Sequence, residues 1–215
     1  MGDERKIEVT QLPVHTVTLN SFSISTTETT VLQWKTFCTA TGRKMPKAPE
    51  GGWRDDNPVV NVNWDDAVAY CDWMSQKTGK LYRLPTEAQW EYAARGGKQN
   101  KGYKYSGSQS IDSVGWYSTN SMNGISTVAL KQPNELGLYD MSGNADEWCQ
   151  DMIVRYGYEA GPQTNPLGAK TGTYRVTRGG SYMDDEGRCR ASARLSQVHD
   201  IKIFYTGFRV VVVEK

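Results

Sequence analysis

The C-terminal stretch, residues 178–213, constrains the fold most, because two strand patterns enclose a long segment that fits neither a helix nor a strand. Residues 173–177 alternate as a strand does, and residues 208–213 form a β-branched run typical of a buried strand. Apolar and charged side chains are mixed between them without a helical stripe or a clean alternation. Such apolar side chains either face a ligand or pack an irregular loop onto its own core, and periodicity leaves both interpretations open.

The first half of the chain carries three helix-start signals. Thr29 or Thr30 can cap a helix that runs to about residue 41, Asn63 a second helix that stops at Gly79, and Thr86 a third. The third helix opens with the spacing of a capping box, Thr-x-x-Gln. Apolar side chains spaced three to four apart predict the buried faces: Val31, Trp34 and Cys38 in the first helix, and Trp64, Val68, Cys71 and Met74 in the second.

A short strand is expected near residues 17–22, and the segments 43–60, 97–137 and 151–172 have the composition of loops. No internal repeat and no interdomain linker is evident. These patterns predict a single α+β domain over residues 1–215, with few helices, short strands and much ordered loop.

Charge and cysteine usage exclude several classes of function. The chain has 25 basic and 24 acidic residues and no basic stretch, which argues against nucleic-acid binding. No apolar run approaches the roughly 20 residues that span a bilayer, and the first residues contain no signal-peptide core. The four cysteines are widely spaced without a CxxC pair, which argues against zinc; disulfides remain possible, although Cys38 and Cys71 are expected to be buried thiols.

Five motifs then occur in a recognisable order. They are residues 58–73 (PVVNVNWDDA, followed by YCDW), 82–97 (YRLPTEAQWEYAARGG), 134–148 (NELGLYDMSGN, followed by EW), 178–190 (RGGS, followed by CR) and 207–209 (GFR). Together they resemble the formylglycine-generating enzyme, or sulfatase-modifying factor, family over about residues 14–213. The resemblance implies an elaborated C-type lectin fold, an α+β fold with two or three helices around short twisted sheets and much ordered loop.

The resemblance also implies what the chain lacks. The oxidases of this family bind copper through two cysteines in the C-terminal segment; here the second falls at Ala191, and the first falls within residues 184–188, where no cysteine stands. Cys189 alone cannot supply a two-thiolate site. The sulfoxide-forming branch uses a histidine triad, and this chain has only His15 and His199. We therefore expect a non-catalytic member that requires no cofactor; the alternative is an oxidase or accessory factor of this family with non-standard chemistry.

The C-terminal segment further resembles the variable region of proteins diversified by retroelements, such as a surface-displayed Treponema lipoprotein, in its GGS, CR and GFR anchors. This implies a diversifiable binding surface, displayed at the cell surface or outside the cell, for an unknown protein or other macromolecular ligand. Any membrane contact would be through a lipid anchor outside this sequence. The candidate ligand-binding residues are Tyr182, Asp184, Asp185, Leu195, Val198, His199, Asp200, Ile201, Ile203, Phe204 and Tyr205.

Within this set, Phe204 and Tyr205 are expected to be apolar anchors. The three aspartates are expected to make polar contacts, which points to a basic or polar ligand. Two alternatives stay open: the aspartates belong to a solvated loop, or Ile201 and Ile203 pack inward, since residues i and i+2 share a strand face.

A calcium site is the second expectation from the family. The resemblance assigns carbonyl oxygens of Ser142, Gly143 and Ala145 and the carboxylate of Glu147 to Ca²⁺, a hard cation that prefers oxygen ligands. The alternative is that Glu147 is buried for structural reasons and hydrogen-bonded to backbone. Arg178 and Arg209 are expected to be structural ion-pair partners rather than ligand residues.

Overall fold

The computed structural model describes residues 1–3, 11–122, 124–153 and 157–213. Its three longer helices begin where the capping signals place them. They are α1 (Val31–Thr41), α2 (Trp64–Thr78) and α3 (Glu87–Ala94). Each has a capping box, formed by Thr30, Asn63 and Thr86 respectively. The first two end at Gly42 and Gly79, whose backbones adopt the left-handed conformation that glycine tolerates.

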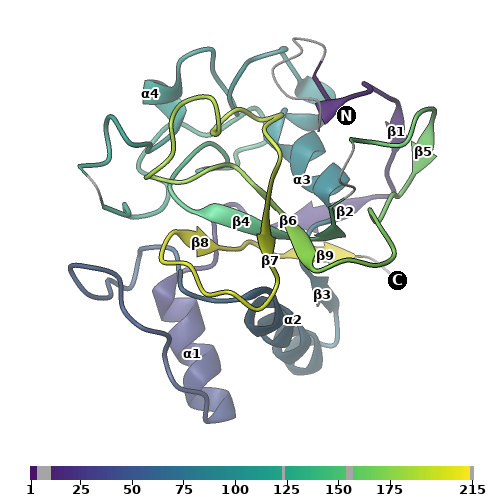
Figure 1. Ribbon diagram of the computed structural model, residues 1–215. Coiled ribbons are helices and arrows are strands. Elements are labelled where there is room, and N and C mark those ends of the chain that lie inside the picture. Colours follow the sequence, from purple (N-terminus) through teal and green to yellow (C-terminus); the bar gives the residue numbers. More distant parts are fainter. Residues whose placement is uncertain (4–10, 123, 154–156, 214–215) are drawn as a thin grey trace.

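Short strands form three small sheets (Figure 1). A parallel pair joins β1 (Val17–Thr18) to β5 (Gln163–Thr164), and a three-stranded sheet has the order β2 (Phe22–Ile24), β9 (Val211–Val213) and β3 (Leu81–Arg83). A four-stranded sheet has the order β7 (Leu195–Val198), β6 (Tyr174–Arg178), β4 (Asp146–Met152) and β8 (Thr206–Gly207). The α+β class predicted from the sequence is therefore confirmed, with β4 as the longest strand.

Two details differ from the sequence-based expectation. The last strand is predicted over residues 208–213 but begins only at Val211, because the Phe208 carbonyl accepts from the Thr29 amide, which lies in a loop rather than in a strand. In α2 the most deeply buried residues are Ala67, Tyr70 and Cys71. The remaining predicted members of that face, Trp64, Val68 and Met74, are only partly buried against the same core.

Two clusters of buried side chains lie on opposite faces of the four-stranded sheet. One packs α1 and α2 against Trp148 and Phe208, with Trp34 and Tyr70 stacked at 5.7 Å between ring centroids. The other packs α3 against β4 and β6 through Trp90, Cys149 and Val176. Alternate residues of β4 supply both clusters, as expected for a strand buried on both faces.

In the described part of the remaining long connections, the helices and strands are the 3₁₀ turn η2 (Gly97–Gln99), the short helix α4 (Ile111–Val114) and β5. Their backbone is ordered by hydrogen bonds to distant segments, for example from the Asn144 amide to the Trp116 carbonyl at 2.8 Å. Among the described residues, none of the helices has the length and hydrophobicity needed to cross a bilayer.

Candidate functional site

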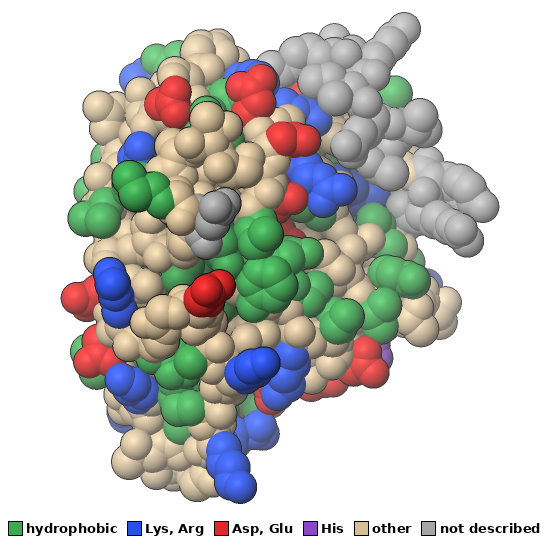
Figure 2. All heavy atoms as spheres, turned by 60° about the vertical axis from the view of Figure 1, so that its left-hand side comes forward, with side chains coloured by type: hydrophobic (Ala, Val, Ile, Leu, Met, Phe, Trp, Pro, Cys, Tyr) green, Lys and Arg blue, Asp and Glu red, His purple; other side chains and the backbone are tan. Residues whose placement is uncertain are grey.

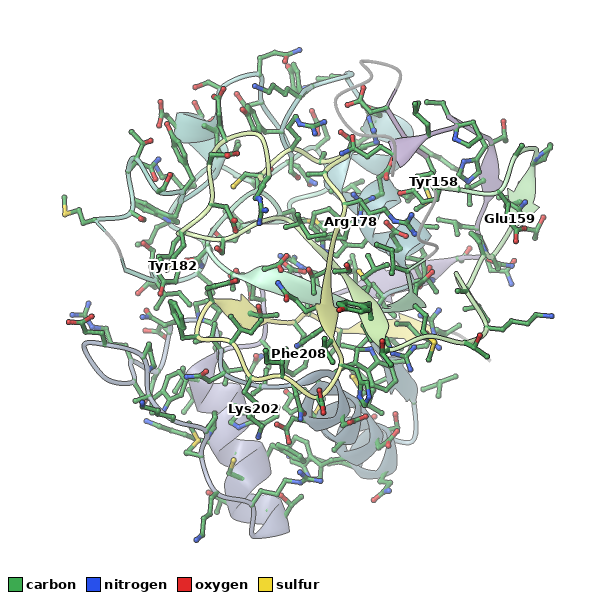
Figure 3. All side chains as sticks on the ribbon, in the orientation of Figure 1. Tyr158, Glu159, Arg178, Tyr182, Lys202 and Phe208 are labelled. Atoms are coloured by element: carbon green, nitrogen blue, oxygen red, sulfur yellow. The ribbon has the colours of Figure 1, made fainter. Side chains whose placement is uncertain are left out.

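The candidate binding segment, residues 181–206, leaves the core after β6 and returns to it at β8. It contains β7 and two irregular stretches, residues 181–194 and 199–205. Figure 3 shows Tyr182 and Lys202, from these two stretches, on the same side of the molecule. When that side is turned forward, hydrophobic side chains gather in the middle of the face, with charged side chains scattered around them (Figure 2).

Most residues predicted to bind a ligand reach the surface. Ile201 and Phe204 are each 45% exposed, and the phenyl ring of Phe204 meets the ring of Tyr205 edge-on at 5.1 Å. Asp185 and Asp200 are exposed, whereas the remaining residues that reach the surface are half-buried: Leu195, Val198, His199, Ile203 and Tyr205. Ile201 and Ile203 do not share a strand face, because residues 199–205 form turns rather than a strand.

Two predicted binding residues have a different environment. Tyr182 is only 5% exposed, so its inclusion among surface contacts was wrong; its carbonyl accepts a hydrogen bond from Ser121, which ties the segment to the loop before it. Asp184 accepts hydrogen bonds from the amide and the hydroxyl of Ser181 and pairs with Arg188 at 3.3 Å. These contacts close a local turn, because the carboxylate reaches back to the amide three residues earlier, as the acidic residue of a capping box does. They leave the Asp184 carboxylate little freedom to meet a ligand.

Beneath the segment, Arg209 forms a fully buried ion pair with Glu147. Its Nε and Nη2 atoms donate to the two carboxylate oxygens at 2.7 Å each, and the indole of Trp90 donates to the same carboxylate at 2.7 Å. Bidentate geometry of this kind is what makes a buried pair favourable despite desolvation. The expectation that Arg209 is a structural ion-pair partner is confirmed.

Arg178 is the centre of a second buried network. Its guanidinium donates to Glu91 and to the Ala193 carbonyl, and lies 3.5 Å from Glu87. Arg194 donates to Glu87 through two nitrogens at 2.8 and 2.9 Å. Burial alone raises the pKa of Glu91, but the positive charges of Arg178 and Arg95 bring it below its ordinary value. Both ends of the binding segment are thus attached to the core by arginine.

The predicted calcium ligand Glu147 does not fit that role, because protein donors already occupy both carboxylate oxygens. The side chain is buried for structural reasons, as the alternative held, although its partners are the side chains of Trp90 and Arg209 rather than backbone. Of the three carbonyls, that of Ser142 faces the backbone of Gly115, where even a methyl group would clash. Among the described residues no group of three or more His, Cys, Asp or Glu side chains is placed to hold a metal ion.

Asp146 is an unusual buried acid next to the segment. It is 1% exposed, its amide donates to the Tyr205 carbonyl at 2.9 Å, and no described residue hydrogen-bonds to either of its carboxylate oxygens. Burial raises the pKa of Asp146 to about 8; Thr177, which is near but poorly oriented for a hydrogen bond, lowers it in part. Asp146 is therefore protonated at neutral pH.

The four cysteines, all in the described part of the chain, are buried free thiols. Cys149 and Cys189 are completely buried and belong to different core clusters. Burial raises the pKa of both thiols. Since the thiolate is the form that attacks and binds metal, neither cysteine has the environment of a reactive one. The expectation that Cys38 and Cys71 are buried thiols is confirmed.

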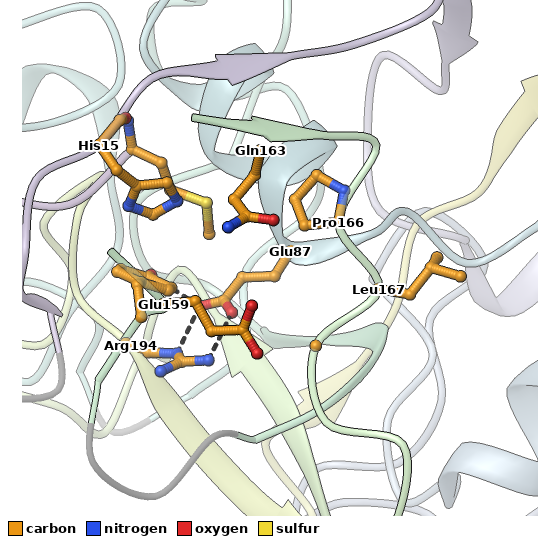
Figure 4. Close-up of a pocket in the computed structure, with 10 residues that line it drawn as sticks. His15, Glu87, Glu159, Gln163, Pro166, Leu167 and Arg194 are labelled. Carbon is orange, nitrogen blue, oxygen red and sulfur yellow. Dashed lines mark hydrogen bonds and ion pairs between the residues drawn. The ribbon is translucent and has the colours of Figure 1, made fainter. Parts of the chain in front are cut away.

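A cavity of about 130 Å³ on another face has no counterpart among the sequence-based predictions. Figure 4 shows His15, Gln163, Glu87 and Arg194 turned toward it. Glu87 is satisfied there by Arg194 and by the Tyr158 hydroxyl at 3.0 Å. The His15 ring packs against that of Tyr158 in a tilted arrangement, with 5.0 Å between the ring centroids.

Comparison with known proteins places this geometry in context. Residues 1–213 match the sulfatase-modifying factor enzyme 1-like domain. The formylglycine-generating enzyme of Streptomyces coelicolor is 33% identical over 260 residues, which cover 93% of this chain and 80% of that enzyme. The formylglycine-generating enzyme of Thermomonospora curvata is 38% identical over 186 residues, but the match spans only 59% of its length.

A solved structure is also similar over nearly the whole chain. The Treponema denticola variable protein 1 superposes with a TM-score of 0.85 at 27% sequence identity, covering 98% of this chain and 90% of the other. The same scaffold is therefore found both in enzymes and in a variable protein.

Proposed function

Because this chain belongs to the sulfatase-modifying factor family, we propose that it is a non-catalytic member that binds a ligand through its C-terminal segment. Its fold is the lectin-type α+β fold of that family, as the resemblance implied. The segment 181–206 is a diversifiable recognition surface, displayed at the cell surface or outside the cell by a lipid anchor outside this sequence. Its partner is a protein or another macromolecule other than nucleic acid, and no cofactor is required.

One observation carries this proposal: the anchors of the segment are buried, while its C-terminal stretch, residues 195–205, reaches the solvent. Arg178 and Arg209 are fully buried, whereas Ile201 and Phe204 are 45% exposed. A surface whose residues can change needs a scaffold whose stability does not depend on them. Aromatic and branched side chains such as Phe204 supply contact area while losing little rotamer entropy on binding.

The second candidate function is an oxidase or accessory factor of the formylglycine-generating type. The identity of 33–38% to such enzymes favours it. The burial of Cys149 and Cys189 and the raised pKa of their thiols weigh against it, because thiolate chemistry needs an accessible sulfur with a lowered pKa.

The binding proposal is tested by selecting clones from a phage-displayed random-peptide library and a displayed single-domain protein library on the purified chain. Clones enriched on the wild type are then measured against a Phe204→Ala/Tyr205→Ala variant. We expect at least a tenfold loss of affinity, as for the loss of aromatic anchors. The matched control is Leu81→Ala, since Leu81 on β3 is also about half exposed (47%) but lies outside the segment; it should bind normally.

Enriched clones that bind the double variant as tightly as the wild type would place recognition elsewhere on the molecule.

The enzymatic alternative is tested by loading the chain with copper and incubating it with a cysteine-containing peptide. The proposal predicts no aldehyde above the level of a Cys189→Ser variant, and copper-dependent turnover above that level would refute it.

A further inference from the structure

Strand β7 is an edge of the four-stranded sheet and lies within the candidate binding segment. The order β7-β6-β4-β8 leaves one side of Leu195–Val198 without a neighbouring strand. Figure 1 shows β7 in front of β6, on the near side of the sheet. Among the described residues, none donates to or accepts from the backbone of Ser196 on that side, and none accepts from the Val198 amide.

The register of the β6–β7 pair identifies which backbone groups face outward. The His199 amide donates to the Thr173 carbonyl, and hydrogen-bonded and non-hydrogen-bonded pairs alternate along an antiparallel ladder. The pairs Arg175–Gln197 and Thr177–Leu195 are therefore the hydrogen-bonded ones. It follows that Ser196 and Val198 direct their backbone groups away from β6; the Val198 carbonyl is closed by a local turn with the Ile201 amide.

This edge carries none of the devices that usually block strand addition. Exposed edges are commonly protected by lysine, proline, a bulge or extreme shortness. β7 reads LSQV, pairs in register over its whole length, and has no charge and no proline. The opposite edge, β8, is only two residues long. The open backbone groups of Ser196 and Val198 therefore form a template for one more strand.

We propose that the ligand of this chain is, in part, an extended peptide segment that adds to β7 by strand pairing and presents a Lys or Arg near Asp65 and Asp200. This inference rests on the proposed function and specifies the partner. Strand addition takes its affinity from main-chain hydrogen bonds and its specificity from the side chains around the edge. The half-buried Val198 and the exposed Ile201 border the added strand on its apolar side.

The charges at one end of β7 specify the basic residue. Asp65 is 61% exposed and pairs with the His199 ring at 3.3 Å. Asp200, which follows His199 in the chain, is also exposed. Each exposed carboxylate attracts a cation only modestly, and the two negative charges together attract it more than one does. The neighbouring Lys202 is held by Asp66 at 2.7 Å.

A second copy of the chain is a poorer occupant of this edge. Stable dimers bury roughly 1,200–2,000 Å² in total, and a four-residue strand with three open backbone groups offers far less. An edge of this size matches a single peptide strand whose further contacts come from the neighbouring apolar side chains.

The test uses peptides selected from a random 12-residue phage library on the wild-type chain, then synthesised and measured by calorimetry. Ser196→Pro removes an outward N–H that the fold does not use, so this edge strand can accommodate the proline. The substitution should weaken peptide binding at least tenfold. The matched control, Ser196→Ala, keeps the N–H and should bind within twofold of wild type. Asp65→Asn/Asp200→Asn should weaken peptides that carry Lys or Arg and leave their Gln-substituted forms unchanged.

Amide hydrogen exchange of the wild-type chain keeps the test independent of how Ser196→Pro folds. Bound peptide should slow exchange at Ser196 and Val198 at least tenfold, with little change at Leu195 and Gln197, which are already bonded to β6. Peptides that bind Ser196→Pro normally, a library that yields no binder, or a dimer that Ser196→Pro dissociates would overturn the proposal. Normal peptide binding by Ser196→Pro would leave the proposed function standing if Phe204→Ala/Tyr205→Ala still weakened the clones from the single-domain protein library at least tenfold.

Discussion

Arg209 is one of the buried ionic residues on which the scaffold depends. It shares Glu147 with Trp90 in a fully buried site, so Arg209→Met would leave a buried carboxylate without its cation. We expect a loss of about 3–5 kcal/mol in the free energy of unfolding, measured by urea denaturation. Adding Glu147→Leu should recover part of that loss, because the unpaired charge is then gone; a single-variant loss below about 1 kcal/mol would contradict this account.

Asp146 should make the stability of the protein depend on pH. Its pKa is raised to about 8 in the folded state, so between pH 4 and 8 the unfolded chain releases a proton that the folded chain retains. Folding therefore loses stability as pH rises through this window. Asp146→Asn removes that dependence, and its stability relative to wild type should increase from pH 4 to pH 8 in urea titrations. A constant difference would mean that Asp146 ionises normally.

Calcium should have little effect, because Arg209 and Trp90 occupy the carboxylate that would bind it. We expect the melting temperature to be unchanged between millimolar calcium and a chelator. A rise of several degrees with calcium, abolished by Glu147→Gln, would show that the ion displaces Arg209.

At the level of single residues, the sequence predicted charged partners better than exposure. Arg178 and Arg209 were expected to be structural ion-pair partners rather than ligand residues, and both form buried ion pairs. Tyr182 was placed among the surface contacts but is buried, because no periodic pattern exists in a turn to show which side chain points inward. The acidic partners of Arg178 lie on α3, about ninety residues away in the chain, beyond the reach of local patterns.

At the level of elements, the helix starts and the strands at both ends of the C-terminal segment were predictable, whereas the other short strands and the pairing of strands were not. Helix starts are encoded within four residues, so Thr30, Asn63 and Thr86 could be identified directly. Strands of two or three residues are too short for an alternation to be read. Strand pairing, such as that of β9 with both β2 and β3, is determined by long-range packing, and so the open edge of β7 could not be foreseen.

The cap of α1 offers a direct test of this encoding. Thr30 accepts from the Gln33 amide while Gln33 bonds back to the Thr30 amide, so Thr30→Ala should cost about 1 kcal/mol of unfolding free energy. Thr36→Ala is the matched control, because the exposed Thr36 hydroxyl bonds only to the carbonyl one turn back and should change stability by less than about 0.5 kcal/mol. Equal effects would show that the cap contributes nothing.

At the level of the whole molecule, folding and recognition are assigned to different residues. Buried aromatic rings between α1, α2 and Phe208 and the arginine networks around Glu87, Glu91 and Glu147 hold the chain together. The segment between those anchors contributes its exposed side chains to the surface instead. The scaffold shared with both enzymes and a variable protein is consistent with function residing in this replaceable part.

The most direct test of this division is a protease-survival measurement on two displayed libraries. One randomises His199, Ile201, Ile203, Phe204 and Tyr205, and the other randomises Glu147, Arg178 and Arg209. Most members of the first library should resist protease as the wild type does, and almost none of the second. If the protease-resistant members of the first library carried only apolar residues in place of Ile203, Phe204 and Tyr205, the segment would be part of the core. That result would contradict the account.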